Sequence, residues 1–152
     1  MILIALGANL PSPVGSPAAT LQHALGELDG KGVKIGRVSS FYETPAWPDP
    51  ADPAFINAVA AVHTAFQPVE LLMLLHGVET DVGRLRSAPN APRTLDIDLI
   101  DYDGRVMEGR LVLPHPRMTE RSFVLVPLAE IAPDWRHPVT GQTVETLLRS
   151  LG

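Results

Sequence analysis

At 152 residues the chain is long enough for a hydrophobic core, and we expect residues 1–152 to form a single domain. Hydrophobic residues make up 45% and charged residues 19% of the sequence, which excludes an intrinsically disordered chain, and no apolar stretch approaches a membrane span. The net charge of −5 argues against general nucleic-acid binding, and the zero cysteines exclude disulfides and thiolate metal sites, a composition compatible with the cytoplasmic location that we expect.

The first half of the chain predicts a strand, a helix and two further strands. Residues 2–8 form an apolar run typical of a buried strand, and residues 18–28 carry leucine and alanine at helical spacing. Residues 33–41 predict a second strand. Four prolines within residues 45–53 remove backbone donors and fix φ, so this segment is predicted to be a stiff loop. Residues 55–66 are rich in Val, Ile, Ala and Phe and predict a third strand.

The second half begins with a helix and a strand separated by a loop. Residues 68–82 predict a helix, with a proline in its first turn and leucines and valines along one face. Residues 84–92 predict a short polar loop, and residues 94–102 predict a strand. The dipeptide Asp103-Gly104 then indicates a hairpin turn.

The C-terminal part predicts additional elements beyond this core. Residues 111–113 indicate a short extended piece, residues 118–131 a helix broken near Pro127, and residues 143–151 a final helix. The order strand-helix-strand-strand-helix-strand is typical of α+β proteins with a ferredoxin-like split β-α-β core. We therefore expect an antiparallel sheet covered by helices, with extra C-terminal elements.

Two aspartates in the predicted strand 94–102 are the strongest functional signal. Asp96 and Asp98 alternate with apolar residues, so both carboxylates should point to the same face of the sheet. At about 5 Å and an effective dielectric constant near 20, two such charges repel each other by roughly 3 kcal/mol. A divalent cation turns this repulsion into a binding site, and carboxylate oxygens are the ligands that magnesium prefers.

Arginines surround this pair of carboxylates in the sequence. Residues 1–82 carry three basic and eight acidic side chains, whereas residues 83–123 carry seven arginines and six acids. An arginine-rich segment that contains a carboxylate pair suits a polyphosphate held together with its metal. Solvated ion pairs are the alternative interpretation of the same arginines.

Six stretches of the sequence occur in the order typical of one enzyme family. They are Ala5-Leu6-Gly7-Ala8-Asn9-Leu10, Ser39-Ser40-Phe41-Tyr42-Glu43-Thr44-Pro45, Phe55-Ile56-Asn57-Ala58-Val59, Glu79 with Gly83-Arg84-Leu85-Arg86, Pro92-Arg93-Thr94-Leu95-Asp96-Ile97-Asp98, and Pro114-His115-Pro116-Arg117-Met118 with Arg121-Ser122-Phe123-Val124-Leu125. Together the stretches resemble the 6-hydroxymethyl-7,8-dihydropterin pyrophosphokinase family of the folate pathway. The resemblance implies transfer of pyrophosphate from ATP to the hydroxymethyl group of the reduced pterin, with AMP as the other product and two Mg²⁺ ions required.

The resemblance also implies a role for individual residues. Asp96 and Asp98 match the ligands of both magnesium ions, and Arg84 and Arg93 match residues that stabilise charge in the transition state. The ATP-binding positions match Glu79, Arg86, Arg93, Leu99, Arg110, His115 and Arg121. The pterin-binding positions match Thr44, Pro45, Trp47, Phe55, Asn57 and Phe123, of which the two phenylalanines would stack on the ring and the asparagine would bind its amide edge.

Two alternative functions also fit these residues, and one segment departs from the family pattern. A magnesium-dependent nucleotidyltransferase also uses a strand Asp-x-Asp, but would release pyrophosphate, and a non-catalytic ferredoxin-like domain would bind a ligand without turnover. The loop 85–91 has no aromatic residue, whereas well-known members place a tryptophan over the active site there. We expect small-molecule substrates as the only partners, and a monomer.

Overall fold

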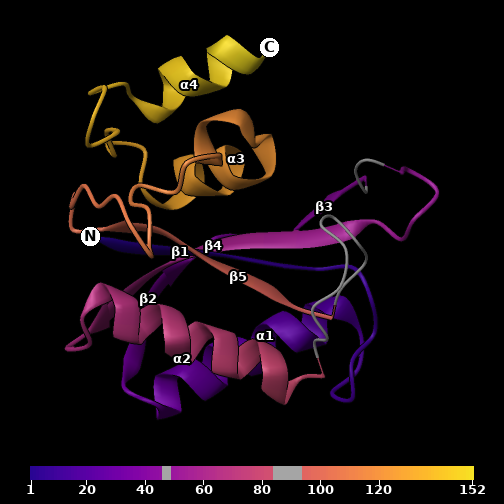
Figure 1. Cartoon of the computed structure of the whole chain (residues 1–152). Helices are drawn as coiled ribbons and strands as arrows, with labels where there is room; N and C mark the ends of the chain where they lie inside the picture. Colours follow the sequence, from indigo (N-terminus) through magenta and orange to yellow (C-terminus); the bar gives the residue numbers. More distant parts are fainter. Residues whose placement is uncertain (46–48, 84–93) are drawn as a thin grey trace.

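The structure is a computed structural model that describes residues 1–45, 49–83 and 94–152. The helices and strands follow one another in the predicted order, with one short strand in addition (Figure 1). The elements are β1 (Ile2–Ala8), α1 (Pro17–Gly30), β2 (Val33–Val38), β3 (Tyr42–Thr44), β4 (Phe55–Thr64), α2 (Pro68–Asp81), β5 (Asp96–Tyr102), a 3₁₀ turn (Met118–Glu120), α3 (Ser122–Ile131) and α4 (Val144–Leu151).

The strands form one antiparallel sheet in the order β2-β4-β1-β5, and β3 pairs with β4 beside β2. The helix α1 connects β1 to β2, and α2 connects β4 to β5, so each helix crosses over a strand that lies between the two it joins. Neighbouring strands that are not consecutive in the chain are the mark of the split β-α-β arrangement. The predicted ferredoxin-like α+β core with extra C-terminal elements is confirmed.

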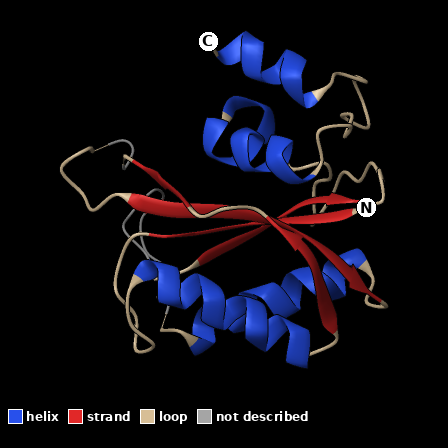
Figure 2. Cartoon of the chain, turned by 180° about the vertical axis from the view of Figure 1, so that it is seen from behind, coloured by secondary structure: helices blue, strands red, loops and turns tan. Residues whose placement is uncertain are grey.

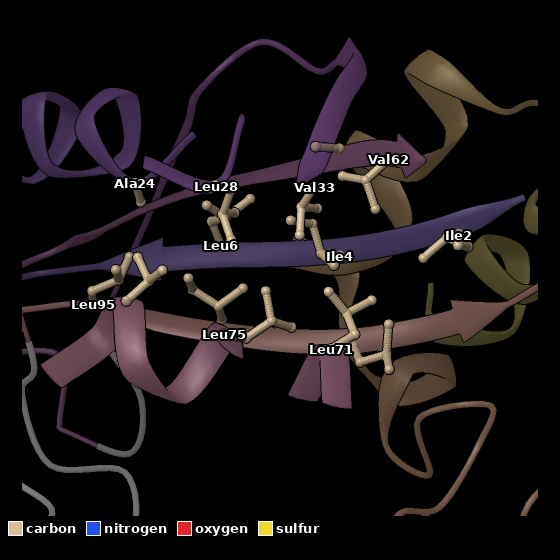
Figure 3. Close-up of a cluster of buried hydrophobic side chains, with 14 of the residues drawn as sticks. Ile2, Ile4, Leu6, Ala24, Leu28, Val33, Val62, Leu71, Leu75 and Leu95 are labelled. Carbon is tan, nitrogen blue, oxygen red and sulfur yellow. The ribbon is translucent and has the colours of Figure 1, made fainter. Parts of the chain in front are cut away.

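Helices cover both faces of the sheet (Figures 1 and 2). The helices α1 and α2 lie on one face, while α3 lies on the other and is covered by α4. Alternate residues of β1 supply the two cores, because a strand sends successive side chains to opposite faces. Ile2, Ile4 and Leu6 pack toward α1 and α2, as Figure 3 shows, whereas Leu3 packs with the residues of α3 and α4.

Local capping explains where several helices begin. The Ser16 hydroxyl accepts a hydrogen bond from the Ala19 amide at the start of α1, and Thr143 does the same for Thr146 at the start of α4. At the start of α2, Gln67 and Glu70 form a capping box, in which each side chain binds the other residue's backbone N–H. The helix predicted over 68–82 therefore begins where its proline indicates and is confirmed.

Two boundaries differ from the sequence prediction. The strand predicted over 33–41 shifts its register against β4 between Ile35 and Val38 and ends at Val38, and β3 follows as a separate strand. The predicted helix break at Pro127 is wrong, because α3 continues through this residue and the break lies at Arg121, whose backbone is extended. Buried neighbours on both sides of Pro127, Val124 and Leu128, hold the helix against the sheet despite the missing backbone hydrogen bond.

A bulge in β5 anchors the C-terminal elements. Leu99 pairs with Ile4 and Asp101 with Leu3, so Ile100 is an extra residue in the strand. The bulge turns the side chains of both Ile100 and Asp101 toward α3 and α4: Ile100 joins that core, and Asp101, which is 3% exposed, accepts a hydrogen bond from the indole N–H of Trp135 at 2.9 Å.

The turn predicted at Asp103-Gly104 is present, with both residues at positive φ and the Arg105 amide bonded to the Tyr102 carbonyl. The chain after it does not return along β5. Instead, Met107 forms a bridge with Leu113, which places the predicted extended piece 111–113. Among the described residues, no helix is long and apolar enough to cross a membrane.

Candidate active site

The register of the sheet brings the candidate residues into two rows on the face that α3 covers. Gly7 of β1 pairs with Asn57 of β4 on one side and with Asp96 of β5 on the other. Two residues earlier in β1, Ala5 pairs with Asp98 of β5. Since side chains alternate along each strand, Asp96 and Asp98 share the face of Asn57, as the sequence predicted.

A cavity of about 630 Å³ opens over these rows. Its floor is the sheet, one wall is β3 with the residue after it, and another wall is the start of α3. Eight of the predicted site residues line it: Thr44, Pro45, Phe55, Asn57, Asp96, Asp98, Arg121 and Phe123. This volume is in the range of small-molecule binding sites.

Arg121 and His115 flank the carboxylate of Asp98 at the end of the cavity nearest β5. The Nη1 atom of Arg121 lies 3.5 Å from Oδ2 of Asp98, and Nε2 of His115 lies 3.9 Å from the same oxygen. The guanidinium of Arg121 also lies 5.5 Å from the centre of the Phe123 ring. Arg121 therefore connects the acidic end of the cavity to its aromatic wall.

The position of His115 follows from its backbone. The prolines on both sides restrict the chain to extended geometry, and the His115 N–H donates to the Ile100 carbonyl, so this segment runs beside β5. Its Nδ1 accepts a hydrogen bond from the Arg117 amide at 3.1 Å, so a neutral ring carries its proton on Nε2, which faces Asp98. The pKa of His115 is lowered to about 4, mainly because the ring is buried and also because of the charges of Arg121 and Arg117, while the charge of Asp96 acts in the opposite direction.

The amide of Asn57 is held in place at the other end of the cavity. Its Nδ2 donates to the Thr44 hydroxyl at 2.7 Å, and the side chain is only 5% exposed. A Cβ atom at Gly7 would lie 2.8 Å from Oδ1 of Asn57, closer than real contacts of this kind. Glycine at position 7 therefore leaves the space that the Asn57 amide occupies.

Glu79 supports the strand of the aspartates from the opposite side. This carboxylate of α2 is 2% exposed and accepts a hydrogen bond from the Ile97 amide at 2.8 Å. Ile97 is the residue between Asp96 and Asp98, and β5 is the edge strand of the sheet. Glu79 thus accepts a hydrogen bond from the Ile97 amide, which lies on the open edge of the sheet and would otherwise need another acceptor.

The remaining predicted residues divide into two groups. Arg110 is exposed on the loop after β5. The side chain of Leu99 is only 2% exposed and belongs to the core on the side of α1 and α2. A nucleotide could therefore reach Leu99 only through its backbone. Neither lines the cavity. Trp47, Arg84, Arg86 and Arg93 lie outside the described residues, as does the loop 85–91.

Sequence reasoning missed several residues that line the cavity, including Gly7, Arg117 and Glu120. Arg117 follows the Pro-His-Pro segment directly, so its proximity to His115 was a usable signal. The role of Gly7 depends on which residues it pairs with, and its own strand contains no information about that register.

The two aspartates suit a magnesium ion that a substrate helps to bind. Among the residues that the structure describes, no group of three or more His, Cys, Asp or Glu side chains could enclose a metal ion. Magnesium usually binds proteins through one or two carboxylates and completes its shell with water and phosphate oxygens. Two carboxylates on one face of a strand, open to a cavity, match that donor set.

Comparison with known proteins shows which family the chain resembles in sequence. A sequence model of the family described as 7,8-dihydro-6-hydroxymethylpterin-pyrophosphokinase (HPPK) matches residues 3–133. The chain is 42% identical over 151 residues to a 2-amino-4-hydroxy-6-hydroxymethyldihydropteridine pyrophosphokinase of Synechocystis, an alignment that covers 98% of this chain and 75% of that protein. It is 41% identical over 145 residues to the protein of the same name from Methylorubrum extorquens, covering 94% of this chain and 90% of the relative.

Solved structures agree on the fold. A crystal structure of a Plasmodium falciparum HPPK-DHPS triple mutant superimposes with a TM-score of 0.76 at 14% identity. The match covers 98% of this chain and 42% of the Plasmodium chain. From the family match and from relatives that are about 40% identical over nearly the whole chain, we conclude that this chain belongs to the 7,8-dihydro-6-hydroxymethylpterin-pyrophosphokinase family.

Proposed function

We propose that the chain transfers the terminal pyrophosphoryl group of ATP to the hydroxyl of 6-hydroxymethyl-7,8-dihydropterin, a reaction of folate biosynthesis. The hydroxyl oxygen bonds to the β-phosphorus, the bond from that phosphorus to the oxygen bridging it to the α-phosphorus breaks, and AMP leaves. The hydroxyl proton is released. The observation that carries the proposal is the family match over residues 3–133, combined with one cavity that holds both the carboxylate pair and an aromatic–amide pocket.

The end of the cavity near β3 suits the flat, polar ring of a pterin. Phe55 and Phe123 line it from β4 and α3, and aromatic rings stack on planar heterocycles. Asn57 supplies an amide, which both donates and accepts hydrogen bonds, and Thr44 holds that amide in one orientation. Thr44, Pro45 and Trp47 would complete the proposed edge contacts.

The other end of the cavity suits the triphosphate. Asp96 and Asp98 would hold two Mg²⁺ ions, which when bound neutralise phosphate charge and polarise the phosphoryl group under attack. Arg121 lies 3.5 Å from Asp98, which supports the proposal that its forked donors would bind a phosphate oxygen. His115 is neutral at pH 7, because its pKa is about 4, and its Nε2–H is a hydrogen-bond donor that adds no charge.

The rest of the ATP site remains a proposal from the family resemblance. Arg84 and Arg93 would stabilise the developing charge, and Arg86 and Arg110 would bind the nucleotide. Glu79 and the backbone of Leu99 would lie near the adenosine, and the burial of both side chains supports a contact through β5 rather than through an exposed surface.

A product assay tests the proposed function. The purified chain is incubated with ATP, Mg²⁺ and the reduced hydroxymethylpterin, and the nucleotide products are separated. We expect AMP and the pterin diphosphate in equal amounts. Release of ADP or of free pyrophosphate would refute the proposal, since a nucleotidyltransferase forms pyrophosphate, and so would binding without any turnover.

Three further properties are part of the proposal. Activity should disappear with a chelator and return with Mg²⁺, and isothermal titration in the presence of a non-hydrolysable ATP analogue should count two ions. Residues 1–152 should act as one domain and as a monomer, which light scattering after size-exclusion chromatography checks. A cytoplasmic location is expected from the sequence and is tested by fractionation of the source cells.

A further inference from the structure

A carboxylate on α3 binds the segment that connects β2 to β3. The two oxygens of Glu130 accept hydrogen bonds from the Ser40 amide at 3.0 and 2.9 Å. Glu130 also accepts from the Ser40 hydroxyl at 3.2 Å and from the phenol hydroxyl of Tyr42. We call Glu130, Ser40 and Tyr42 the Glu130 clamp. It joins residues about 90 positions apart in the sequence.

The strand that the clamp holds has few other anchors. In the described part of the chain, β3 spans only Tyr42–Thr44 and pairs with β4 alone, at the edge of the sheet. A three-residue edge strand forms few ladder hydrogen bonds and belongs to the least stable class of strand. The Glu130 clamp is therefore a second attachment for β3, on the side that faces α3.

Both segments that the Glu130 clamp joins also carry residues that line the cavity. Tyr42 is followed two residues later by Thr44, which points to the same face and binds Asn57. On α3, Glu130 lies seven residues after Phe123, which corresponds to about two helical turns and places both on one side of the helix. The clamp thus connects the wall that carries Thr44 and Pro45 to the wall that carries Phe123.

We propose that Glu130 is a positioning residue for the pterin: it sets the spacing between β3 and α3 and so the width of the pterin end of the cavity. The proposal rests on the proposed function. Glu130 does not line the cavity, so it acts through Tyr42 and Ser40 rather than by touching the substrate.

The charge state of the clamp is consistent with this role. The Tyr42 hydroxyl and the Ser40 amide hold the pKa of Glu130 below its usual value, and the carboxylate raises the pKa of Tyr42. At neutral pH Glu130 is therefore an anion that only accepts, and Tyr42 a neutral phenol that donates.

The two tyrosines of the chain provide a matched test. Tyr42→Phe removes the hydroxyl that binds Glu130, and Tyr102→Phe removes a hydroxyl that binds the Phe66 carbonyl on the other side of the sheet. We expect Tyr42→Phe to raise the KM and Kd for the pterin roughly three- to tenfold, because a less ordered pocket must be organised on binding. The KM for ATP should stay within about twofold, and Tyr102→Phe should leave both KM values unchanged.

Variants of Glu130 extend the test. Glu130→Ala removes every bond of the clamp and should raise the pterin KM at least as much as Tyr42→Phe does. Glu130→Gln retains one acceptor oxygen and should give an intermediate value. If Glu130→Ala does not fold, the pterin KM of Tyr42→Phe alone decides the proposal, since this variant loses only the phenol oxygen and should fold normally.

The results that overturn the proposal are distinct from those that overturn the proposed function. An unchanged pterin KM in Tyr42→Phe, or equal increases in the KM for both substrates, would refute the Glu130 clamp as a positioning device. Absence of AMP from the wild-type chain in the same assay would refute the proposed function instead.

Discussion

Replacing Gly7 by alanine tests the geometry of the pterin end of the cavity with a single added methyl group. The new Cβ would lie 2.8 Å from Oδ1 of Asn57, whereas ordinary contacts begin at 3.4 Å. The amide must therefore retreat by about 0.6 Å or rotate. Gly7 lies in a regular strand, so the backbone itself accepts alanine without strain, and the effect is steric.

The amide of Asn57 has little freedom to move. Its Nδ2 is bonded to the Thr44 hydroxyl at 2.7 Å, and the side chain is almost completely buried. Overpacking of this kind costs about 1–3 kcal/mol of unfolding free energy, and each kcal/mol lowers the melting temperature by about 2–4 °C in a protein of this size. Misplacement of the group proposed to bind the pterin edge should raise the pterin KM at least about tenfold.

The assay is steady-state kinetics with each substrate varied, together with thermal unfolding. The matched control is Gly26→Ala in α1, where nothing lies within 4 Å of the added Cβ. Alanine favours a helix over glycine by about 1 kcal/mol, so this control should be as stable as the wild type or more so, with an unchanged pterin KM. A Gly7→Ala protein with the wild-type pterin KM would show that Asn57 does not contact the substrate in the way proposed.

Three further predictions follow from other parts of the structure. Asp98→Ala should lower turnover at least about 10²-fold while circular dichroism shows an intact fold, because the variant removes a proposed metal ligand; wild-type turnover would contradict the metal assignment. The pKa of His115 is near 6.5 in the unfolded chain and about 4 in the folded protein. This residue therefore stabilises the fold above pH 6.5, and the contribution is lost as the pH falls toward 4. NMR titration of the ring and unfolding of His115→Asn across this pH range will check this prediction. Trp135→Phe should destabilise the fold by about 1–3 kcal/mol, measured by urea unfolding, since it removes a hydrogen bond to the buried Asp101, and kcat/KM should be unchanged because neither residue lines the cavity.

Part of the candidate site could be predicted from local pattern. Alternation along the strand placed Asp96 and Asp98 on one face, and both line the cavity. The two prolines around His115 predicted an extended segment, which runs beside β5. The family resemblance paired Phe55 with Phe123, and both line the same cavity, while the stacking of a ring between them stays a prediction. Each of these inferences uses only residues adjacent in sequence or the family pattern.

Other features depend on contacts that no local pattern contains. Glu79 looked like a helix acid near a nucleotide, and the structure places it in the interior, bonded to the Ile97 amide. Pro127 looked like a helix break, but packing on both sides keeps α3 continuous. The bulge at Ile100, which turns Asp101 toward Trp135, likewise comes from pairing with β1.

Local sequence pattern was sufficient to predict the order of the main elements, the α+β class and the shared face of the two aspartates, because backbone geometry repeats every two residues in a strand and every 3.6 in a helix. The position of Gly7 between Asn57 and Asp96, and the bond from Tyr42 of β3 to Glu130, could be seen only in the folded chain. Strand register and the positions of the helices depend on packing between segments that are far apart in the chain, so no single segment of the sequence predicts them.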